Sequence, residues 1–304
     1  MSNQILGGKI LKLVKERCQS HNNYFQGKLL TIIMFQPPES ETDAQKLAQY
    51  QAAVTSTNQK VKTFRFLGCD VNRIELTADT DEINFAQLLQ DAANDSNSIG
   101  IIVQNPVPKK ELKEELINIP SQLDIDGINQ DNSLFKASAT SEAIARLAES
   151  FALPGDKVAV LGSLGFVGSG VVLFLKEKGI EVIKLDKAKG DSDHDIKEGV
   201  LSADIVISAT GKQDLITQDY LKPAHKLVLD AGFVPLADGT ILGDVAKDAY
   251  NIPQNLTPVP GGIGPTQMAV LLERLMKVAK IEIQPWNYKQ DFLEPASNIN
   301  SQTI

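Results

Sequence analysis

"KVAVLGSLGFVGSGVVLFLKEKG", residues 157–179, joins a short apolar run to a glycine-rich turn and then to a helical pattern of apolar residues. We predict a buried strand over 157–162 and a helix over 167–179. Glycines let the backbone approach a bound pyrophosphate, and the helix N-terminus offers free N–H groups and the positive end of the helix dipole. This stretch therefore predicts the strand–turn–helix unit of a dinucleotide-binding fold.

The spacing of the turn, Gly162-x-x-Gly165-x-x-Gly168, differs from the usual G-x-G-x-x-G. Its context supports a nucleotide site, because an acidic residue, Asp186, ends the next apolar run, 24 positions beyond Gly162. A carboxylate at about this distance binds the adenosine ribose in dinucleotide-binding folds. The alternative is a tight turn followed by a surface aspartate, and a dinucleotide site is the favoured interpretation.

Further apolar runs have the length of buried strands: 28–35, 99–104, 181–185, 204–209 and 226–232. Helical segments such as 269–280 lie between these runs or after them. Alternation of strands and helices predicts βαβ units and a mostly parallel sheet covered on both faces. The segment "FALPGDK", 151–157, is a candidate domain boundary. The predicted fold class is α/β.

Composition excludes several classes of protein. The 304 residues are enough for two domains, and the net charge of -8 opposes general nucleic-acid binding, which needs a basic surface. Two cysteines, Cys18 and Cys69, provide neither a disulfide framework nor a Cys-rich zinc site, so we expect no metal. No apolar run reaches the roughly 20 residues that span a bilayer, and the first residues lack a secretory signal pattern. We expect a cytoplasmic protein with no membrane partner.

Four segments together resemble the bifunctional methylenetetrahydrofolate dehydrogenase/cyclohydrolase family. They are "GIIVQNPVPKKE" (100–111), "LDIDGIN" (123–129), "ADIVISATGKQDLITQDYLKPAHKLVLDAGF" (203–233) and "TPVPGGIGPTQMAVLLERLMK" (257–277). Their order and spacing match the family over nearly the whole chain, and the Pro-Gly-Gly-x-Gly-Pro run is specific to it.

The resemblance implies a two-domain α/β enzyme with its active site in the cleft between the domains. Residues 1–140 plus 269–304 would form the catalytic, folate-binding domain, and 141–268 a Rossmann-type domain that binds NADP or NAD. The implied reaction oxidises 5,10-methylenetetrahydrofolate by hydride transfer, followed in most members by hydrolysis to 10-formyltetrahydrofolate. A homodimer is also implied.

Roles in the folate site follow from the resemblance. Gln104 matches the active-site glutamine, and Asp126 matches the aspartate that holds the pterin ring. Asp124 also matches, but a capping or surface role suits it better. Substrate-binding positions would be Val103, Asn105, Pro260, Gly261, Gly262, Ile263 and Gly264. A tight loop before the final helix would also favour the glycines.

The segment "STNQKVKTFRFLGCDV", 56–71, departs from the family's helix, roughly P-A-S-x-x-Y-V-x-x-K-x-K. Counting back from Gly68, Lys60 takes the place of the catalytic lysine, and Ser56 takes that of the catalytic tyrosine. The alternative for Lys60 is the solvated face of an ordinary helix. Tyr50 is the nearest tyrosine, but six positions exceed one helical turn, so it could substitute only if the chain kinks or folds back.

Cofactor choice depends on a second departure. Asp186 and Lys187 replace the usual histidine and serine that bind the 2′-phosphate, and a carboxylate there favours the free ribose of NAD. Lys184, Lys187 and Lys189 could offset the repulsion of a phosphate. The predicted cofactor-binding residues are Gly162, Ser163, Leu164, Gly165, Val167, Gly168, Asp186, Lys187 and Phe233.

Two alternatives to a bifunctional enzyme remain. The serine at position 56 is compatible with a dehydrogenase that lacks cyclohydrolase activity, or with a relative that binds folate or nucleotide without turnover. An unrelated NAD-dependent dehydrogenase would leave the Pro-Gly-Gly-Ile-Gly-Pro and Asp-Ile-Asp-Gly segments unexplained.

Overall fold

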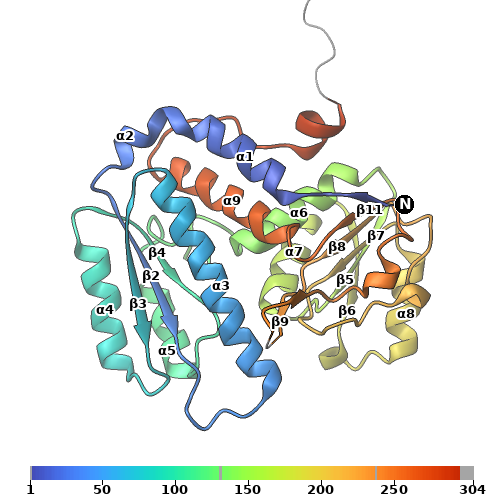
Figure 1. Cartoon of the computed structure of the whole chain (residues 1–304), viewed down its shortest axis with the longest axis horizontal. Helices are drawn as coiled ribbons and strands as arrows, with labels where there is room; N and C mark the ends of the chain where they lie inside the picture. The colour runs from blue at the N-terminus through green and yellow to red at the C-terminus, as the bar shows by residue number, and fades with distance from the viewer. Residues whose placement is uncertain (1, 130–131, 237, 295–304) are drawn as a thin grey trace, which may run out of the picture.

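The computed structural model describes residues 2–129, 132–236 and 238–294, and its two main β-sheets are parallel throughout (Figure 1). The smaller sheet has the order β3-β2-β4, from strands Asp70–Leu76, Leu29–Phe35 and Ser98–Val103. The larger sheet has the order β1-β11-β8-β7-β5-β6, from strands Asn3–Gln4, Asn255–Thr257, Leu227–Asp230, Ile205–Ser208, Lys157–Leu161 and Glu181–Leu185. An antiparallel hairpin joins β9, Val234–Pro235, to β10, Ile241–Leu242. The predicted α/β class with parallel sheets is confirmed.

All six predicted strands are present within one or two residues of their expected bounds. Five of them are runs of apolar residues buried on both faces along most of their length. The sixth, β6, is an edge strand in which only Leu185 is fully buried. The strands that the sequence did not predict are edge strands or very short. β3, "DVNRIEL", lies at an edge of the smaller sheet and is half exposed, so it has no continuous apolar run. β1 and β11 have two and three residues.

The sheets are flanked by helices, and none of the described helices combines the length and the apolar character needed to cross a membrane. The final helix begins at Ile263, six residues before the predicted 269, because Gly262 takes the cap position directly after the Pro-Gly-Gly turn. The helix bounds are α1 Gly7–Cys18, α2 Asn22–Phe25, α3 Ala44–Phe66, α4 Glu82–Asn94, α5 Lys110–Glu114, α6 Ala139–Phe151, α7 Phe166–Glu177, α8 Asp193–Ser202 and α9 Ile263–Val278.

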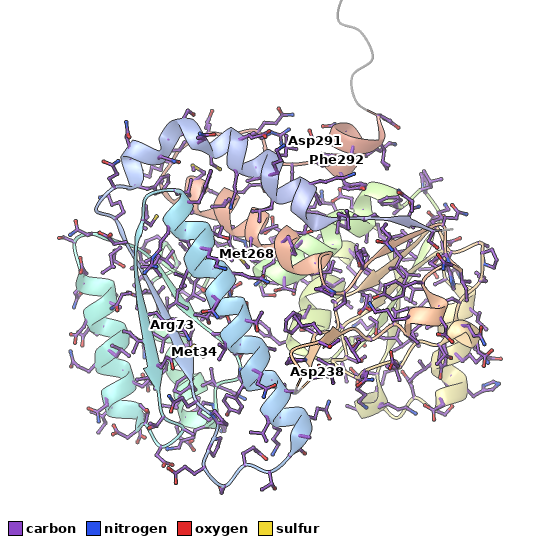
Figure 2. All side chains as sticks on the ribbon, in the orientation of Figure 1. Met34, Arg73, Asp238, Met268, Asp291 and Phe292 are labelled. Carbon is purple, nitrogen blue, oxygen red and sulfur yellow. The ribbon has the colours of Figure 1, made fainter. Side chains whose placement is uncertain are left out.

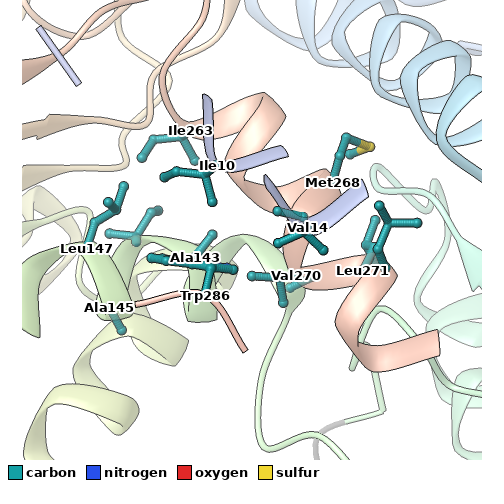
Figure 3. Close-up of a cluster of buried hydrophobic side chains, with 14 of the residues drawn as sticks. Ile10, Val14, Ala143, Ala145, Leu147, Ile263, Met268, Val270, Leu271 and Trp286 are labelled. Carbon is teal, nitrogen blue, oxygen red and sulfur yellow. The ribbon is translucent and has the colours of Figure 1, made fainter. Parts of the chain in front are cut away.

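The main core lies where α1, α6 and α9 meet (Figure 3). Ile10 and Val14 of α1 face Ala143 of α6 and Val270 of α9, and all four are fully buried. α9 also contacts α3, so it connects the helices of the smaller sheet with those of the larger one. The division of the chain into a catalytic domain, 1–140 plus 269–304, and a nucleotide-binding domain, 141–268, stays a prediction. Residues 295–304 of the catalytic domain lie outside the described residues.

The strand order of the larger sheet defines a position for a ligand. From β5 the chain builds β6 on one side, then crosses to β7 and β8 on the other. In open parallel sheets, ligands bind at the carboxyl ends of the two strands on either side of such a reversal. The reversal between β5 and β7 therefore directs attention to the residues after Leu161 and Ser208.

Candidate active site

A cavity of about 630 Å³ lies between the two sheets. One wall is a face of α3, and the other walls are loops that follow strands of both sheets, in the ranges 104–107, 230–233 and 258–265. The β9–β10 hairpin contacts α3 and contributes Ile241 to the lining. In Figure 2, the labelled Asp238 marks the turn of this hairpin beside α3, among the side chains that fill the space between the ribbons.

Helix α3 runs without interruption for 23 residues. Asp43 caps it by accepting hydrogen bonds from the backbone N–H groups of Gln45 and Lys46, at 2.8 and 3.1 Å. The extra residues before position 56 therefore extend the helix at its N-terminus. A single face contributes the cavity residues at helical spacing: Gln49, Ala52, Ala53, Thr55, Ser56 and Gln59.

Lys60, one turn after Ser56, is fully buried. Its Nζ donates hydrogen bonds to Gln104 Oε1 at 2.6 Å and to Asp126 Oδ2 at 2.8 Å. The alternative of a solvated lysine is wrong, because no part of the side chain reaches water. Gln104 lines the cavity, so Lys60 and Asp126 lie one contact behind the cavity wall.

The orientation of the Gln104 amide follows from the chemistry of its neighbour. A lysine ammonium only donates hydrogen bonds, so the carbonyl oxygen of Gln104 must face Nζ. The amide N–H₂ of Gln104 then points the other way. It donates one long hydrogen bond, 3.5 Å, to the carbonyl oxygen of Asn105, which leaves its second N–H for a ligand. The buried charge of Lys60 thus fixes a polar donor at the cavity wall.

Asp126 is held from two sides. Oδ2 binds Lys60, and Oδ1 accepts a long hydrogen bond, 3.3 Å, from the backbone N–H of Ala139 at the first turn of α6. Burial raises the pKa of Asp126, but the charge and hydrogen bond of Lys60 and the charge of Arg274 lower it by more, so the pKa lies below the usual carboxyl value. Asp126 is therefore an anion that balances the buried lysine.

Asp124 has the capping role that the sequence favoured. Its carboxylate accepts hydrogen bonds from the backbone N–H groups of Gly127, Ile128 and Asn129, at 3.0 to 3.1 Å. Arg274 of α9, which the sequence analysis did not single out, donates from the other side to the carbonyl oxygens of Ile125 and Ala137. These bonds fix the loop that carries Asp126.

Ser56 is the residue one helical turn before Lys60 on the same face of α3. Ser56 is half-buried and lines the cavity at the expected helical position. Tyr50 packs in the core with Phe35 and Phe85 and is only 8% exposed. Because α3 is continuous, Tyr50 lies ten residues and about 15 Å along the helix from Lys60, so it does not replace the missing ring.

The loop before α9 forms the wall opposite α3. Asn105 and the segment 260–264 line the cavity as predicted, whereas Val103 is buried at the end of β4 and packs in the core. Gly262 has no room for a side chain, since a Cβ there would lie 2.6 Å from Thr257 Cβ. A Cβ on Gly264 would lie 3.4 Å from Gln59 Oε1 on the facing helix.

The glycine turn lies at the strand-order reversal and fits a dinucleotide. Gly162 has a φ of +76°, and a Cβ there would lie 2.5 Å from the carbonyl oxygen of Ala209, after β7. A Cβ on Gly168 would lie 2.1 Å from the carbonyl oxygen of Gly162, so α7 packs closely on the turn. Gly165 caps α7 and leaves the backbone N–H groups of its first turn without a side-chain cap. Ser163 is buried, and its Oγ has no hydrogen-bond partner among the residues that the structure describes.

Asp186 closes the glycine turn. Its Oδ2 accepts a hydrogen bond from the backbone N–H of Leu164, and its Oδ1 accepts one from Ala188, both at 2.9 Å. Lys187 forms an ion pair with Asp193 at 2.5 Å, and Lys189 forms one with Asp191 at 3.3 Å. Of the remaining predicted cofactor residues, Val167 is half-buried on α7, and Phe233 lines the cavity.

Several cavity residues escaped the sequence analysis. Thr140 opens α6, and Gln267 lies on the first turns of α9. Asp230 ends β8, and its carboxyl group is surrounded by residues of the 243–245 segment. The signal for Asp230 was a single acid at the end of the apolar run "KLVLDAG", which is also common at ordinary strand ends.

Comparison with known proteins adds independent findings. The family description "Tetrahydrofolate dehydrogenase/cyclohydrolase, NAD(P)-binding domain" matches residues 138–283. The bifunctional protein FolD of Clostridium tetani is 32% identical over 227 residues, which is 70% of this chain and 79% of the relative.

Solved structures give the same result. The bifunctional methylenetetrahydrofolate dehydrogenase/cyclohydrolase FolD of Campylobacter jejuni superposes with a TM-score of 0.73 at 26% identity, covering 90% of this chain and 95% of that one. FolD of Trypanosoma brucei, solved with NADP and an inhibitor, has a TM-score of 0.76 at 23% identity and covers 92% and 97%. This second likeness supports the fold.

Proposed function

The chain belongs to the tetrahydrofolate dehydrogenase/cyclohydrolase family, and on that premise we propose that it oxidises 5,10-methylenetetrahydrofolate with a nicotinamide cofactor and hydrolyses the methenyl product to 10-formyltetrahydrofolate. The observation that carries the proposal is the buried Lys60 between Gln104 and Asp126, directly behind the wall of the cavity. Oxidation by hydride transfer also needs a nicotinamide site, and the glycine turn at 162–168 supports one.

In hydride transfer the protein's task is to hold two flat rings in contact. The bound cofactor would supply the hydride acceptor. The glycine turn at 162–168 and the first turn of α7 would hold its pyrophosphate. Gln104 would orient the folate by donating its amide N–H₂, and the 260–264 loop would bring backbone close to the substrate. Phe233 would cover the cofactor side of the cavity.

Hydrolysis makes a different demand, because water attack creates charge and moves protons. Lys60 is a fully buried cation, and its hydrogen bond to Gln104 connects it with the cavity wall. We assign Lys60 the electrostatic and proton-handling role, with Asp126 as its counter-ion. The predicted contact of Asp126 with the pterin ring stays a prediction, because Asp126 lies behind Gln104 and does not line the cavity. Ser56 in place of tyrosine removes the ring that the family resemblance implies one turn before Lys60, which favours weak hydrolysis and keeps a dehydrogenase-only enzyme as the second candidate.

We further propose NAD as the preferred cofactor. Asp186 stands at the end of β6, where a carboxylate accepts hydrogen bonds from a ribose and repels a 2′-phosphate. Of the three lysines that could offset this repulsion, Lys187 and Lys189 are each paired with an aspartate, and Lys184 is exposed on β6.

A spectrophotometric assay tests the function. Purified protein with 5,10-methylenetetrahydrofolate should form reduced cofactor, and methenyltetrahydrofolate supplied alone should be hydrolysed. Folded protein that reduces neither NAD nor NADP would exclude the enzyme. Reduction without hydrolysis would select the dehydrogenase-only candidate.

Two further proposals concern the oligomeric state of the protein and its location in the cell. A homodimer should elute at twice the mass of 33.0 kDa in light scattering, and a monomeric mass would contradict it. The cytoplasmic location stays a proposal that cell fractionation tests.

A further inference from the structure

The substrate-side loop, residues 258–262, lines the cavity and has few backbone donors. Pro258 and Pro260 have no backbone N–H, so Val259 carries the only N–H group of the first three residues. Gly261 follows with a φ of +112°, a region that glycine adopts more freely than other residues. A loop of this composition has much conformational freedom to lose, so its shape depends on contacts with other segments.

Tyr250 and Lys247 contact this loop from the segment between β10 and β11. A short 3₁₀ turn, Lys247–Ala249, places the two side chains on one side of the chain, because residues three apart eclipse each other in such a turn. Lys247 Nζ lies 4.3 Å from the centre of the Tyr250 ring and donates a hydrogen bond to the Tyr250 hydroxyl at 3.1 Å. Tyr250 is 9% exposed and packs in a core of the larger sheet, which gives the pair a fixed base.

This pair occupies both backbone polar groups of Val259. The N–H of Val259 donates to Tyr250 Oη at 3.1 Å, and its carbonyl oxygen accepts from Lys247 Nζ at 2.7 Å. Hydrogen bonds from a charged donor are stronger than those between neutral groups. The peptide groups on either side of Val259 are therefore fixed by two side chains that also bind each other, and we call this arrangement the Tyr250–Lys247 clamp.

The glycine half of the loop is attached by other contacts, to α1, to α9 and within the loop itself. These hydrogen bonds are Gly7 N to Gly261 O at 2.9 Å, Thr266 Oγ1 to Gly262 O at 3.0 Å, and Gly262 N to Pro258 O at 2.8 Å. The clamp attaches the proline half, 258–260, to the segment that follows β10. Each half of the loop is thus held by a different part of the chain.

We propose that Tyr250 and Lys247 are positioning residues that hold the substrate-side loop in the shape that receives the folate. The identity of the ligand rests on the proposed function. Neither side chain lines the cavity, and both act through Val259, which does. A loop that is already ordered binds its ligand without the cost of ordering, so the clamp should affect substrate binding more than the chemical step.

The first test is steady-state kinetics of Tyr250→Phe, which removes the hydroxyl and keeps the ring. The KM for 5,10-methylenetetrahydrofolate should rise about two- to tenfold, the effect of one lost hydrogen bond on an equilibrium constant. The kcat and the KM for NAD should stay near the parent values, because the lost contact contributes to folate binding and not to the transition state alone. An unchanged KM for the folate, or an equal rise in the KM for NAD, would overturn the positioning role.

Variants of Lys247 test whether the two residues act together. Lys247→Met should also raise the KM for the folate, and Lys247→Arg should restore most of the parent value, because a guanidinium can donate to the same two acceptors. Tyr250→Phe/Lys247→Met should raise the KM by less than the product of the two single effects, since both residues hold one peptide. A double effect equal to that product would overturn the clamp as a unit.

A second lysine–tyrosine pair provides the matched control. Lys197 Nζ lies 5.9 Å from the centre of the Tyr220 ring, and neither residue lines the cavity. Lys197→Met and Tyr220→Phe should therefore keep the parent KM for the folate. If these controls raised the KM as much as the clamp variants do, the effect would be general and the positioning role would be overturned.

The second test needs neither substrate nor cofactor. Because Pro258 and Pro260 have no N–H, hydrogen exchange in residues 258–260 reports on Val259 alone. The Val259 N–H should be protected in the parent and should exchange about two- to tenfold faster in Tyr250→Phe. Exchange in the parent at the rate of an unstructured chain would overturn the clamp, even if every variant failed to fold. If the parent turned over no folate, the proposed function would fail, while exchange at Val259 would still decide whether the clamp holds the loop.

Discussion

Replacing Lys60 by methionine should have two effects that can be measured separately: a lower free energy of unfolding and a loss of methenyl hydrolysis. Methionine keeps much of the volume of the lysine side chain but removes the ammonium group that donates to Gln104 and Asp126. The carboxylate of Asp126 is then left buried without its main partner. Breaking a buried ion pair from one side typically costs about 3–5 kcal/mol, so we expect the free energy of unfolding at pH 7 to fall by about that amount.

The pH dependence of this loss identifies its cause. In the parent, Lys60 holds the pKa of Asp126 below its usual value, so the stability that this carboxylate contributes is present above the unfolded pKa and is lost as the pH falls through the folded pKa. In Lys60→Met, burial acts without that opposing charge and the pKa of Asp126 rises. The difference between parent and variant should therefore be largest at pH 7 and should shrink in acid.

The measurement is a urea titration at several pH values, together with assays of both reactions. Lys60→Met/Asp126→Asn should recover part of the lost stability, because the double variant has no unpaired charge. Lys62→Met, on the exposed face of the same helix, is the matched control and should change little. Methenyl hydrolysis should be lost in Lys60→Met while much of the hydride transfer stays. If Lys60→Met matched Lys62→Met in stability and in both reactions, the assigned role of Lys60 would be wrong.

Three further predictions concern the rest of the site. Asp186→Ser should shift the kcat/KM ratio of the two cofactors toward NADP by roughly 1–2 kcal/mol, about five- to thirtyfold, since it removes the charge that repels a 2′-phosphate; an unchanged ratio would mean that Asp186 does not face the ribose. Ser56→Tyr should speed methenyl hydrolysis about two- to tenfold, the kinetic equivalent of about 0.5–1.5 kcal/mol of aromatic packing; unaltered hydrolysis would show that the ring is not what limits it. Gly168→Ala should weaken cofactor binding at least about tenfold and lower the free energy of unfolding by about 1–3 kcal/mol, because the added Cβ would lie 2.1 Å from the carbonyl oxygen of Gly162. Gly8→Ala, where a Cβ meets no atom within 4 Å, is the control. Equal effects of the two substitutions would contradict the packing argument.

Much of the fold was predictable because burial leaves a clear mark on sequence. Strands covered on both faces must be apolar along their length, so 28–35 and 204–209 could be recognised directly. The edge strand β3 escaped because none of its residues is fully buried, so both of its faces tolerate polar residues such as Asp70 and Arg73. The two-residue strand β1 escaped because it has too few residues for any pattern and exists only through its partner, β11.

The candidate site could be predicted from sequence where a short local motif marks a single residue. Gln104 and Lys60 were assigned by matching short motifs, and the structure places them in contact. Asp230 and Asp244 could not be paired from sequence, because the contact joins residues 14 positions apart through a hairpin whose register no local pattern specifies. The continuous course of α3 was likewise hidden, since the added residues before Ser56 could have formed either a loop or more helix.

The pairing of β1 with β11 also constrains the order in which the chain can fold. The backbone N–H of Asn3 donates to the carbonyl oxygen of Gln254, and that of Gly7 donates to Gly261 in the loop beside the cavity. During synthesis the first residues leave the ribosome about 250 positions before their partners. Contacts so distant in sequence carry a large loop-closure cost and form late. The substrate-side wall is therefore completed only after translation has passed residue 261, and until then α1 lacks the helix on which it packs.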